Sequence, residues 1–197
     1  MSKGQETRRQ IIQRAAELFN KKGFHGSSIS DVMECTGLQK GGIYRHFENK
    51  EQLALEAFEY AKSQYTSPLE QAMAQETNGL AKLQAFAKSF YSIVTQPPLG
   101  GGCPVMNTII ENDDGDPALR MRARAAISHW QQLLEDAIQL GISQGSIKAD
   151  LEAQRTAAVI IASLEGGILL SRAHQDISYM QHNYEHVLRF IETDVAA

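Results

Sequence analysis

The sequence predicts an all-α fold of about nine or ten helices. Apolar residues recur at the three- and four-residue spacing of a helix almost throughout the 197 residues, and runs typical of strands are almost absent. The chain contains only five prolines, so long helices are seldom interrupted. Residues that typically start a helix stand where this apolar pattern breaks. At one such place Asp116 is an N-cap residue, and Pro117 follows at the first helical position.

Four helices are expected near the N-terminus. The first ends at a basic turn and Gly23, and its apolar face consists of Ile11, Ile12, Ala15, Leu18 and Phe19. Ser28 and Asp31 resemble a capping box at the start of a second helix of about eight residues, which exits at Gly37. A third short helix covers about residues 40–46, and Asn49 caps a fourth.

Proline, glycine and acidic clusters divide the rest of the chain into further helices. They are expected at about residues 68–76, 78–95, 104–112, 117–143, 151–173 and 177–193. We place the domain boundary near residues 47–50. An N-terminal domain of residues 1–49 then extends into a linking helix at 50–66, and residues 50–197 form a C-terminal domain.

The charge is distributed unevenly between these two parts. Residues 1–50 contain nine Lys or Arg and five Asp or Glu, a net charge of +4, whereas the remainder has ten basic and eighteen acidic residues, a net charge of −8. Such asymmetry fits an N-terminal part that binds a polyanion. Chance segregation on two solvated surfaces is the alternative.

Several classes of protein are excluded or disfavoured. Charges throughout the first twenty residues exclude an ordinary secretory signal. The longest apolar stretch, 157–170, is too short to span a bilayer and is interrupted by Glu165. Cys35 and Cys103 are far apart and lack metal-ligand spacing. We therefore expect a cytoplasmic protein with no metal ion or cofactor.

Residues 27–47 have the pattern of a helix-turn-helix, in which a capped helix, a tight turn at Gly37 and a second short helix follow one another. Six apolar residues are spaced to pack the two helices together and against Phe19 and Phe24: Ile29, Val32, Met33, Leu38, Ile43 and Phe47.

The second helix of this motif leaves a small, polar and basic face outward, formed by Gln39, Lys40, Gly41, Gly42, Tyr44, Arg45 and His46. A helix fits the major groove of B-DNA, and glycines allow its backbone to approach closely. Each glycine costs a helix about 1 kcal/mol relative to alanine. A purely structural helix has little reason to accept two, so the pattern predicts a DNA-reading helix.

Residues 7–58 resemble the TetR family of helix-turn-helix repressors. The resemblance rests on Ile12, Ala15, Ala16, Leu18, Phe19 and Gly23-Phe24, on Ser27-Ser28-Ile29 with Val32, and on Gly37 to Phe47 with Lys50 and Leu53. Two positions depart from the family pattern. Gln39 stands where Ser or Thr often caps the reading helix, and Gly42 stands where Thr or Ser is common.

The resemblance implies roles for individual residues. Ser28, Tyr44, His46 and Lys50 would contact phosphates, and Gln39, Lys40, Gly41 and Gly42 would face base edges, while Arg45 suits either role. For Tyr44 and His46 the alternative is packing at the domain junction. For Lys50 it is a solvated surface position.

For the rest of the chain, the resemblance implies a helical domain that dimerises and encloses an effector. Segment 153–171 is apolar nearly all round, so it needs cover on both sides. We expect an isologous homodimer through Ala158, Ile161, Ala162, Gly166, Leu169, Tyr184, Val187, Leu188 and Ile191. The alternative is a monomer with helix 151–173 at the centre of its core.

Candidate wall residues of the effector pocket are Phe86, Phe90, Tyr91, Cys103, Met106, Met121, His129, Trp130 and Leu133. For each of them plain core packing is the alternative. Glycines 100–102 before Cys103 suggest a flexible gate. Cys103 also suggests a thiol sensor, against the alternative of a buried, inert thiol.

The sequence carries no catalytic constellation, so we expect no enzyme. It predicts a ligand-responsive repressor that binds a pseudo-palindromic operator in double-stranded DNA as a homodimer and is released by a small-molecule effector. The alternatives are control by a partner protein, thiol modification at Cys103, activation in place of repression, and an enzyme that uses the C-terminal cavity.

Overall fold

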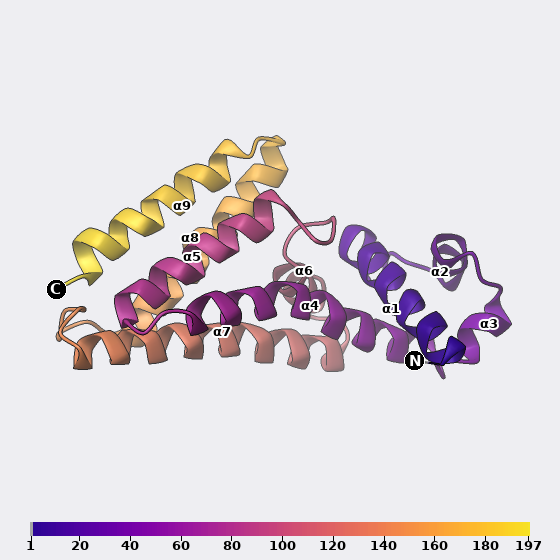
Figure 1. Cartoon of the computed structure of the whole chain (residues 1–197). Coiled ribbons are helices and arrows are strands. Elements are labelled where there is room, and N and C mark those ends of the chain that lie inside the picture. Colours follow the sequence, from indigo (N-terminus) through magenta and orange to yellow (C-terminus); the bar gives the residue numbers. More distant parts are fainter. Residues whose placement is uncertain (1) are drawn as a thin grey trace. The chain divides into compact units, whose positions relative to one another are not determined.

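The computed structural model describes residues 2–197, and the regular structure in this range is helical (Figure 1). The elements are α1 (Lys3–Lys22), α2 (Ile29–Thr36), α3 (Lys40–Tyr44), α4 (Lys50–Ala74), α5 (Gly79–Thr95), α6 (Pro104–Glu111), α7 (Pro117–Ser143), α8 (Ala153–His174), α9 (Ser178–Phe190) and the π-helical turn η1 (Ile191–Val195). The predicted all-α class is confirmed.

One predicted break does not occur, because α4 continues through Pro68. A proline inside a helix costs about 3 kcal/mol, since it removes one hydrogen bond and its ring crowds the preceding turn. Tyr65, Leu69 and Met73 recur at four-residue intervals around it and are at most 5% exposed. Burying each such side chain contributes about 1.5–3 kcal/mol, so packing offsets the proline.

The chain forms two compact units, and the domain boundary proposed near residues 47–50 lies within the first of them. The first unit joins residues up to Gln64 with Pro98–Ala125, and the second joins Tyr65–Pro97 with Ala126–Ala197. Segment 98–125 belongs to the N-terminal unit because Leu99 is 7% exposed within the apolar cluster of that unit.

The apolar cluster of the first unit holds the helix-turn-helix together. Val32, Ile43 and Phe47 are buried against Ile11 and Ala15 of α1. Ile29, Met33 and Leu38 pack on the same cluster while half-buried. The predicted packing of the six apolar residues together with Phe19 is thereby confirmed, whereas Phe24 is in edge contact with the Phe19 ring.

In the second unit α8 packs beside α9, and α5 contacts both (Figure 1). A side chain at Gly167 would lie 2.9 Å from the Met180 sulfur, so this glycine permits close packing of α8 on α9. By length and composition α8 is the one described helix that could cross a membrane, yet 44% of its apolar window is buried inside the protein. It is a core helix.

Candidate nucleic-acid interface

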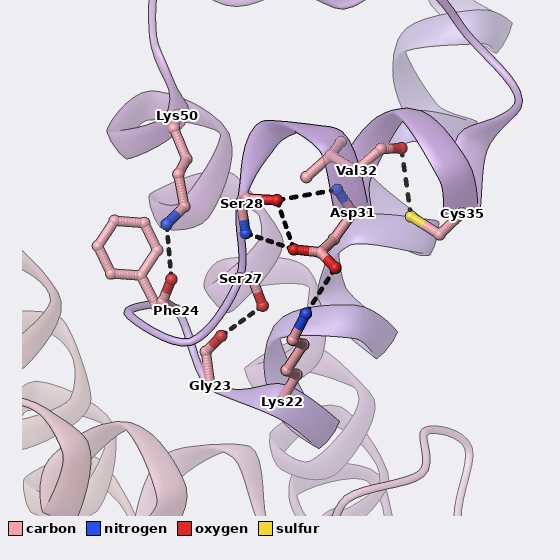
Figure 2. A network of polar contacts seen from close by, with 9 residues as sticks. All are labelled: Lys22, Gly23, Phe24, Ser27, Ser28, Asp31, Val32, Cys35 and Lys50. Atoms are coloured by element: carbon pink, nitrogen blue, oxygen red, sulfur yellow. Dashed lines mark hydrogen bonds and ion pairs between the residues drawn. The ribbon is translucent and has the colours of Figure 1, made fainter.

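The second helix of the motif is fixed by a reciprocal cap (Figure 2). Ser28 Oγ accepts a hydrogen bond from the backbone N–H of Asp31 at 3.2 Å, and the Asp31 carboxylate accepts from the N–H of Ser28 at 2.6 Å. Lys22 Nζ lies 2.5 Å from the same carboxylate. The bonds from Lys22 and Ser28 hold the pKa of Asp31 well below its ordinary value. The predicted capping box is confirmed.

The turn between α1 and α2 is held by hydrogen bonds to both backbone groups of Phe24, its N–H and its carbonyl oxygen. Lys50 Nζ donates to the Phe24 carbonyl oxygen at 2.6 Å and lies 4.2 Å from the centre of its ring (Figure 2). The Glu111 carboxylate, at the end of α6, accepts from the N–H of Phe24 at 3.0 Å and of His25 at 2.8 Å. A cation from α4 and an anion from α6 therefore bind the backbone of the same residue.

Gly23 makes room for this arrangement. Its φ is +84°, and a Cβ at this position would lie 2.7 Å from Glu111 Oε1. Any side chain would strain the backbone and collide with the carboxylate. The glycine predicted only as a helix stop thus also admits the end of α6.

A second polar contact joins α1 to the segment that follows residue 98. Asn20 Nδ2 donates to the carbonyl oxygens of Gly100 and Gly102 at 2.8 and 2.9 Å. Asn107 Nδ2, from α6, donates to the carbonyl of Gly101 at 2.8 Å and to Asn20 Oδ1 at 3.0 Å. The three-glycine loop, suggested from sequence as a flexible gate, therefore has all three carbonyls bonded, two of them to α1 through Asn20 and one to α6 through Asn107.

The outward face of α3 is open around its glycines. In the part of the chain that the structure describes, no neighbouring atom lies within 4 Å of a Cβ built on Gly41. At Gly42 the nearest atom is the Leu38 Cβ at 3.6 Å, an ordinary contact. Either position has space for alanine, so packing within the protein does not require the glycines.

The start of α3 lacks the usual side-chain cap. Gln39 occupies the N-cap position, and its side chain makes no capping bond to residues 2–197. A missing cap costs about 1 kcal/mol and each glycine about as much relative to alanine. The missing cap and the two glycines together lower the stability of α3 and leave its backbone uncovered by side chains.

Most of the predicted DNA-binding residues lie together on the surface of the first unit. Ser28, Gln39, Lys40, Gly41, Tyr44 and Arg45 are exposed, and Gly42, His46 and Lys50 are half-buried. Lys40 Nζ lies 5.9 Å from the centre of the Tyr44 ring. Two of the predicted phosphate ligands have internal partners, because Ser28 caps α2 and Lys50 binds Phe24.

The sequence analysis missed Asn20, Asn107 and Glu111. A signal existed for Glu111, since an acid in the last turn of a helix opposes the helix dipole and implies another partner. Asn20 and Asn107 gave no comparable signal, because their contacts join segments about eighty residues apart.

The predicted pocket residues divide between the two units. Phe86, Phe90 and Trp130 are buried together in the second, where Trp130 Nε1 donates to Thr66 Oγ1 at 3.0 Å. Cys103 is completely buried in the first unit, in which Met106 is half-buried. Tyr91 and Leu133 of the second unit are half-buried, and Tyr91 stacks on Tyr184 with ring centres 4.4 Å apart.

Two of the pocket candidates lie on the surface. Met121 is 66% exposed. His129 is also exposed, and its Nε2 lies 2.7 Å from a Glu70 carboxylate oxygen. Their exposure argues against a place in an enclosed wall, and it arises because α7 turns these positions away from the buried stripe that contains Trp130.

The residues predicted for the dimer interface also separate into two groups. Ile161, Val187 and Ile191 are 7%, 1% and 0% exposed, so the protomer's own core already covers them. Their positions on α8, α9 and η1 face the helices of the same unit. Ala158, Ala162 and Leu169 are exposed, and Gly166, Tyr184 and Leu188 are half-buried.

Comparison with known proteins identifies the family. Residues 11–57 match the family model of the bacterial regulatory proteins of the tetR family, and residues 79–187 match that of the tetracyclin repressor-like C-terminal domain. The crystal structure of a TetR transcriptional regulator from Chloroflexus aurantiacus is 44% identical, covers 100% of this chain and 99% of its own, and superimposes with a TM-score of 0.95. The chain belongs to the TetR family.

Two curated relatives, both helix-turn-helix-type regulators by name, match most of the chain as well. The transcriptional regulator LmrA of Bacillus subtilis is 29% identical over 90% of this chain and 92% of its own length. The transcriptional repressor DhaR of a Mycobacterium species is 26% identical over 82% of this chain and 80% of its own. The TetR-family protein described here is a DNA-binding transcriptional regulator, and it is not an enzyme.

Replacing Asp31 with Asn tests the capping network through its pH dependence. The folded-state pKa of Asp31 is depressed, so its contribution to stability is present above its ordinary value of 3.8 and is lost as the pH falls below it. We expect D31N to have a lower melting temperature than the wild type at pH 7, with the difference shrinking between about pH 4 and pH 2. Glu34→Gln, an exposed acid on the same helix, is the control, and an equal effect of both variants would contradict the assignment.

Proposed function

We propose that this regulator is a repressor that binds a pseudo-palindromic operator as a homodimer and leaves it when a small molecule binds. The observation that carries the proposal is the bare outer face of α3, where Gly41 meets open space between exposed Lys40 and Tyr44. Such a face is costly for a helix and fits close approach to another surface. The repressor role rests on the likeness to the Mycobacterium repressor. We place the protein in the cytoplasm, with its operator.

In this proposal α3 enters the major groove of B-DNA. Lys40, Gly41 and Gly42 face base edges, and Tyr44, Arg45 and His46 lie toward the backbone of the duplex. Two copies of α3 would occupy half-sites about 34–36 Å apart or somewhat farther. The positive charge of residues 1–50 favours this approach, so operator affinity will fall steeply with salt.

An exposed apolar stripe on α8 supports the homodimer. Val159, Leu169 and Leu170 are 39%, 56% and 40% exposed, and Ala162 and Gly166 lie between them on the same helical face. In the structure described, no neighbour lies within 4 Å of a Cβ on Gly166, so a partner helix can approach closely there. A second copy of α8 fits such a self-complementary stripe around a two-fold axis.

The contacts of α6 suggest how an effector releases DNA. Asn107 bonds α6 to the C-terminal end of α1, Glu111 bonds it to the turn that follows, and Lys50 bonds α4 to the same turn. An effector that prefers a shifted α6 or α4 would pull on this turn and thus on the helix-turn-helix. Its effect is limited to its differential affinity for the two positions. Phe86, Phe90 and Trp130 pack on one another in the core of the second unit, so an effector that entered there would need apolar surface.

Substitution of Tyr44 tests the DNA contact. Tyr44→Ala should weaken operator binding about tenfold at fixed salt. The substitution removes the proposed contact to the DNA backbone and the aromatic ring near the Lys40 ammonium. The measurement is fluorescence anisotropy with DNA selected from a random pool, with melting temperature and dimer content as checks. Tyr44→Phe retains the ring and isolates the hydroxyl. Wild-type affinity in Tyr44→Ala would remove this residue from the interface.

Substitution of Leu169 tests the dimer. Leu169→Glu places a charge in the apolar stripe, so the variant should sediment as a monomer at micromolar concentration. Ile110→Glu is the matched control, because Ile110 on α6 is equally an exposed apolar residue. A Leu169→Glu protein that stays dimeric would show that the stripe is not the interface.

Neutralising Glu111 distinguishes two effects of this residue on DNA binding: its hydrogen bonds to the turn after α1 and its negative charge. Removal of a negative charge near DNA should strengthen binding by simple Coulomb attraction. We expect the opposite for Glu111→Gln, a loss of operator affinity of about fivefold or more, because the turn carrying α2 and α3 loses a charge-assisted anchor. Asp114→Asn removes an exposed charge nearby and should leave binding unchanged or stronger. Stronger binding by Glu111→Gln would refute the anchoring role.

A further inference from the structure

We infer that Gln39, the N-cap residue of α3, reads an adenine in each operator half-site and distinguishes it from the other bases. The inference deepens the proposed function and rests on it, since it requires that α3 enters the major groove.

The backbone of Gln39 starts the helix without help from its side chain. Its carbonyl oxygen accepts from the N–H of Gly42 at 2.8 Å and of Ile43 at 3.3 Å. The side chain is exposed and makes no capping bond within the described chain. A serine or threonine at this position would turn its short hydroxyl back onto the helix. Glutamine instead keeps an amide, on two methylene groups, directed at the surroundings.

Few neighbouring side chains of Gln39 are long enough to reach the same base edges. Gly41 and Gly42 have no side chains, so the first turn of α3 carries only Gln39 and Lys40 as long side chains. Lys40 Nζ lies 5.9 Å from the centre of the Tyr44 ring, one turn further along the helix. The N-terminal residues of a reading helix are those that reach base edges, which places Gln39 at the groove floor.

The chemistry of the amide selects one base. Gln offers one donor and one acceptor side by side, and adenine presents the complementary pair, the N7 acceptor and the N6 donor. Guanine presents two acceptors, which suit the donor-only Lys40 better. Cytosine presents a donor alone, and thymine an acceptor beside a methyl group, so neither satisfies both groups of the amide.

The test uses operator DNA selected from a random pool and an atom-level change in it. Each adenine of the half-site is replaced symmetrically by 7-deazaadenine, which loses the N7 acceptor. At one position the wild type should bind about tenfold more weakly per half-site, whereas Gln39→Ala should be indifferent to the same replacement. Lys40→Ala should remain as sensitive as the wild type there.

Two further outcomes distinguish a loss of adenine recognition from a loss of folding and from a failure of the proposed function. Gln39→Ser restores a capping residue, so it should melt no lower than the wild type and still lose the adenine preference. Wild-type protein that ignores every 7-deazaadenine, or Gln39→Ala that remains sensitive, would overturn this inference while leaving DNA binding intact. Failure to select any DNA would instead sink the proposed function itself.

Discussion

The backbone of Phe24 is the point through which the helix-turn-helix is oriented. Its carbonyl oxygen is bound by the Lys50 ammonium and its N–H by the Glu111 carboxylate, so two opposite charges from different helices fix one peptide neighbourhood. Hydrogen bonds that include a charged group are about twice as strong as neutral ones. Because α2 follows this turn directly and α3 packs on α2, the direction of α3 depends on both bonds.

Much of the fold followed from patterns that are local in sequence. The spacing of Ile11, Ala15 and Phe19, the cap at Ser28 and the start at Asp116 each act within a turn or two of helix, and the structure has helices at all three places. Pro68 shows the limit, since the burial of Tyr65 and Leu69 overrides a local break. The predicted outward face of α3 depended on local sequence too, and Gln39, Lys40, Gly41 and Tyr44 lie together there.

Contacts between distant segments were beyond such reasoning. Nothing near Leu99 in sequence indicates that it joins the apolar cluster of the first unit, and the bond between Asn20 and Asn107 joins two half-buried polar residues. The face of α9 was equally ambiguous, because an apolar stripe can cover a neighbouring helix or a second copy of the chain. Val187 and Ile191 cover the protomer's own core, whereas Leu169 on α8 does not. Only packing decides between such choices.

The composition of α3 has a consequence for its dynamics. Five residues, two of them glycine, at an uncapped start make this the element with the lowest helical propensity of its unit. Segments of that kind open locally far more often than the globular core unfolds. If α3 enters a duplex as proposed, binding would also order a loosely formed turn, and the lost backbone entropy would offset part of the binding enthalpy. A mismatched base pair would then lower the binding affinity in two ways, because a contact is lost and because the turn of α3 stays disordered.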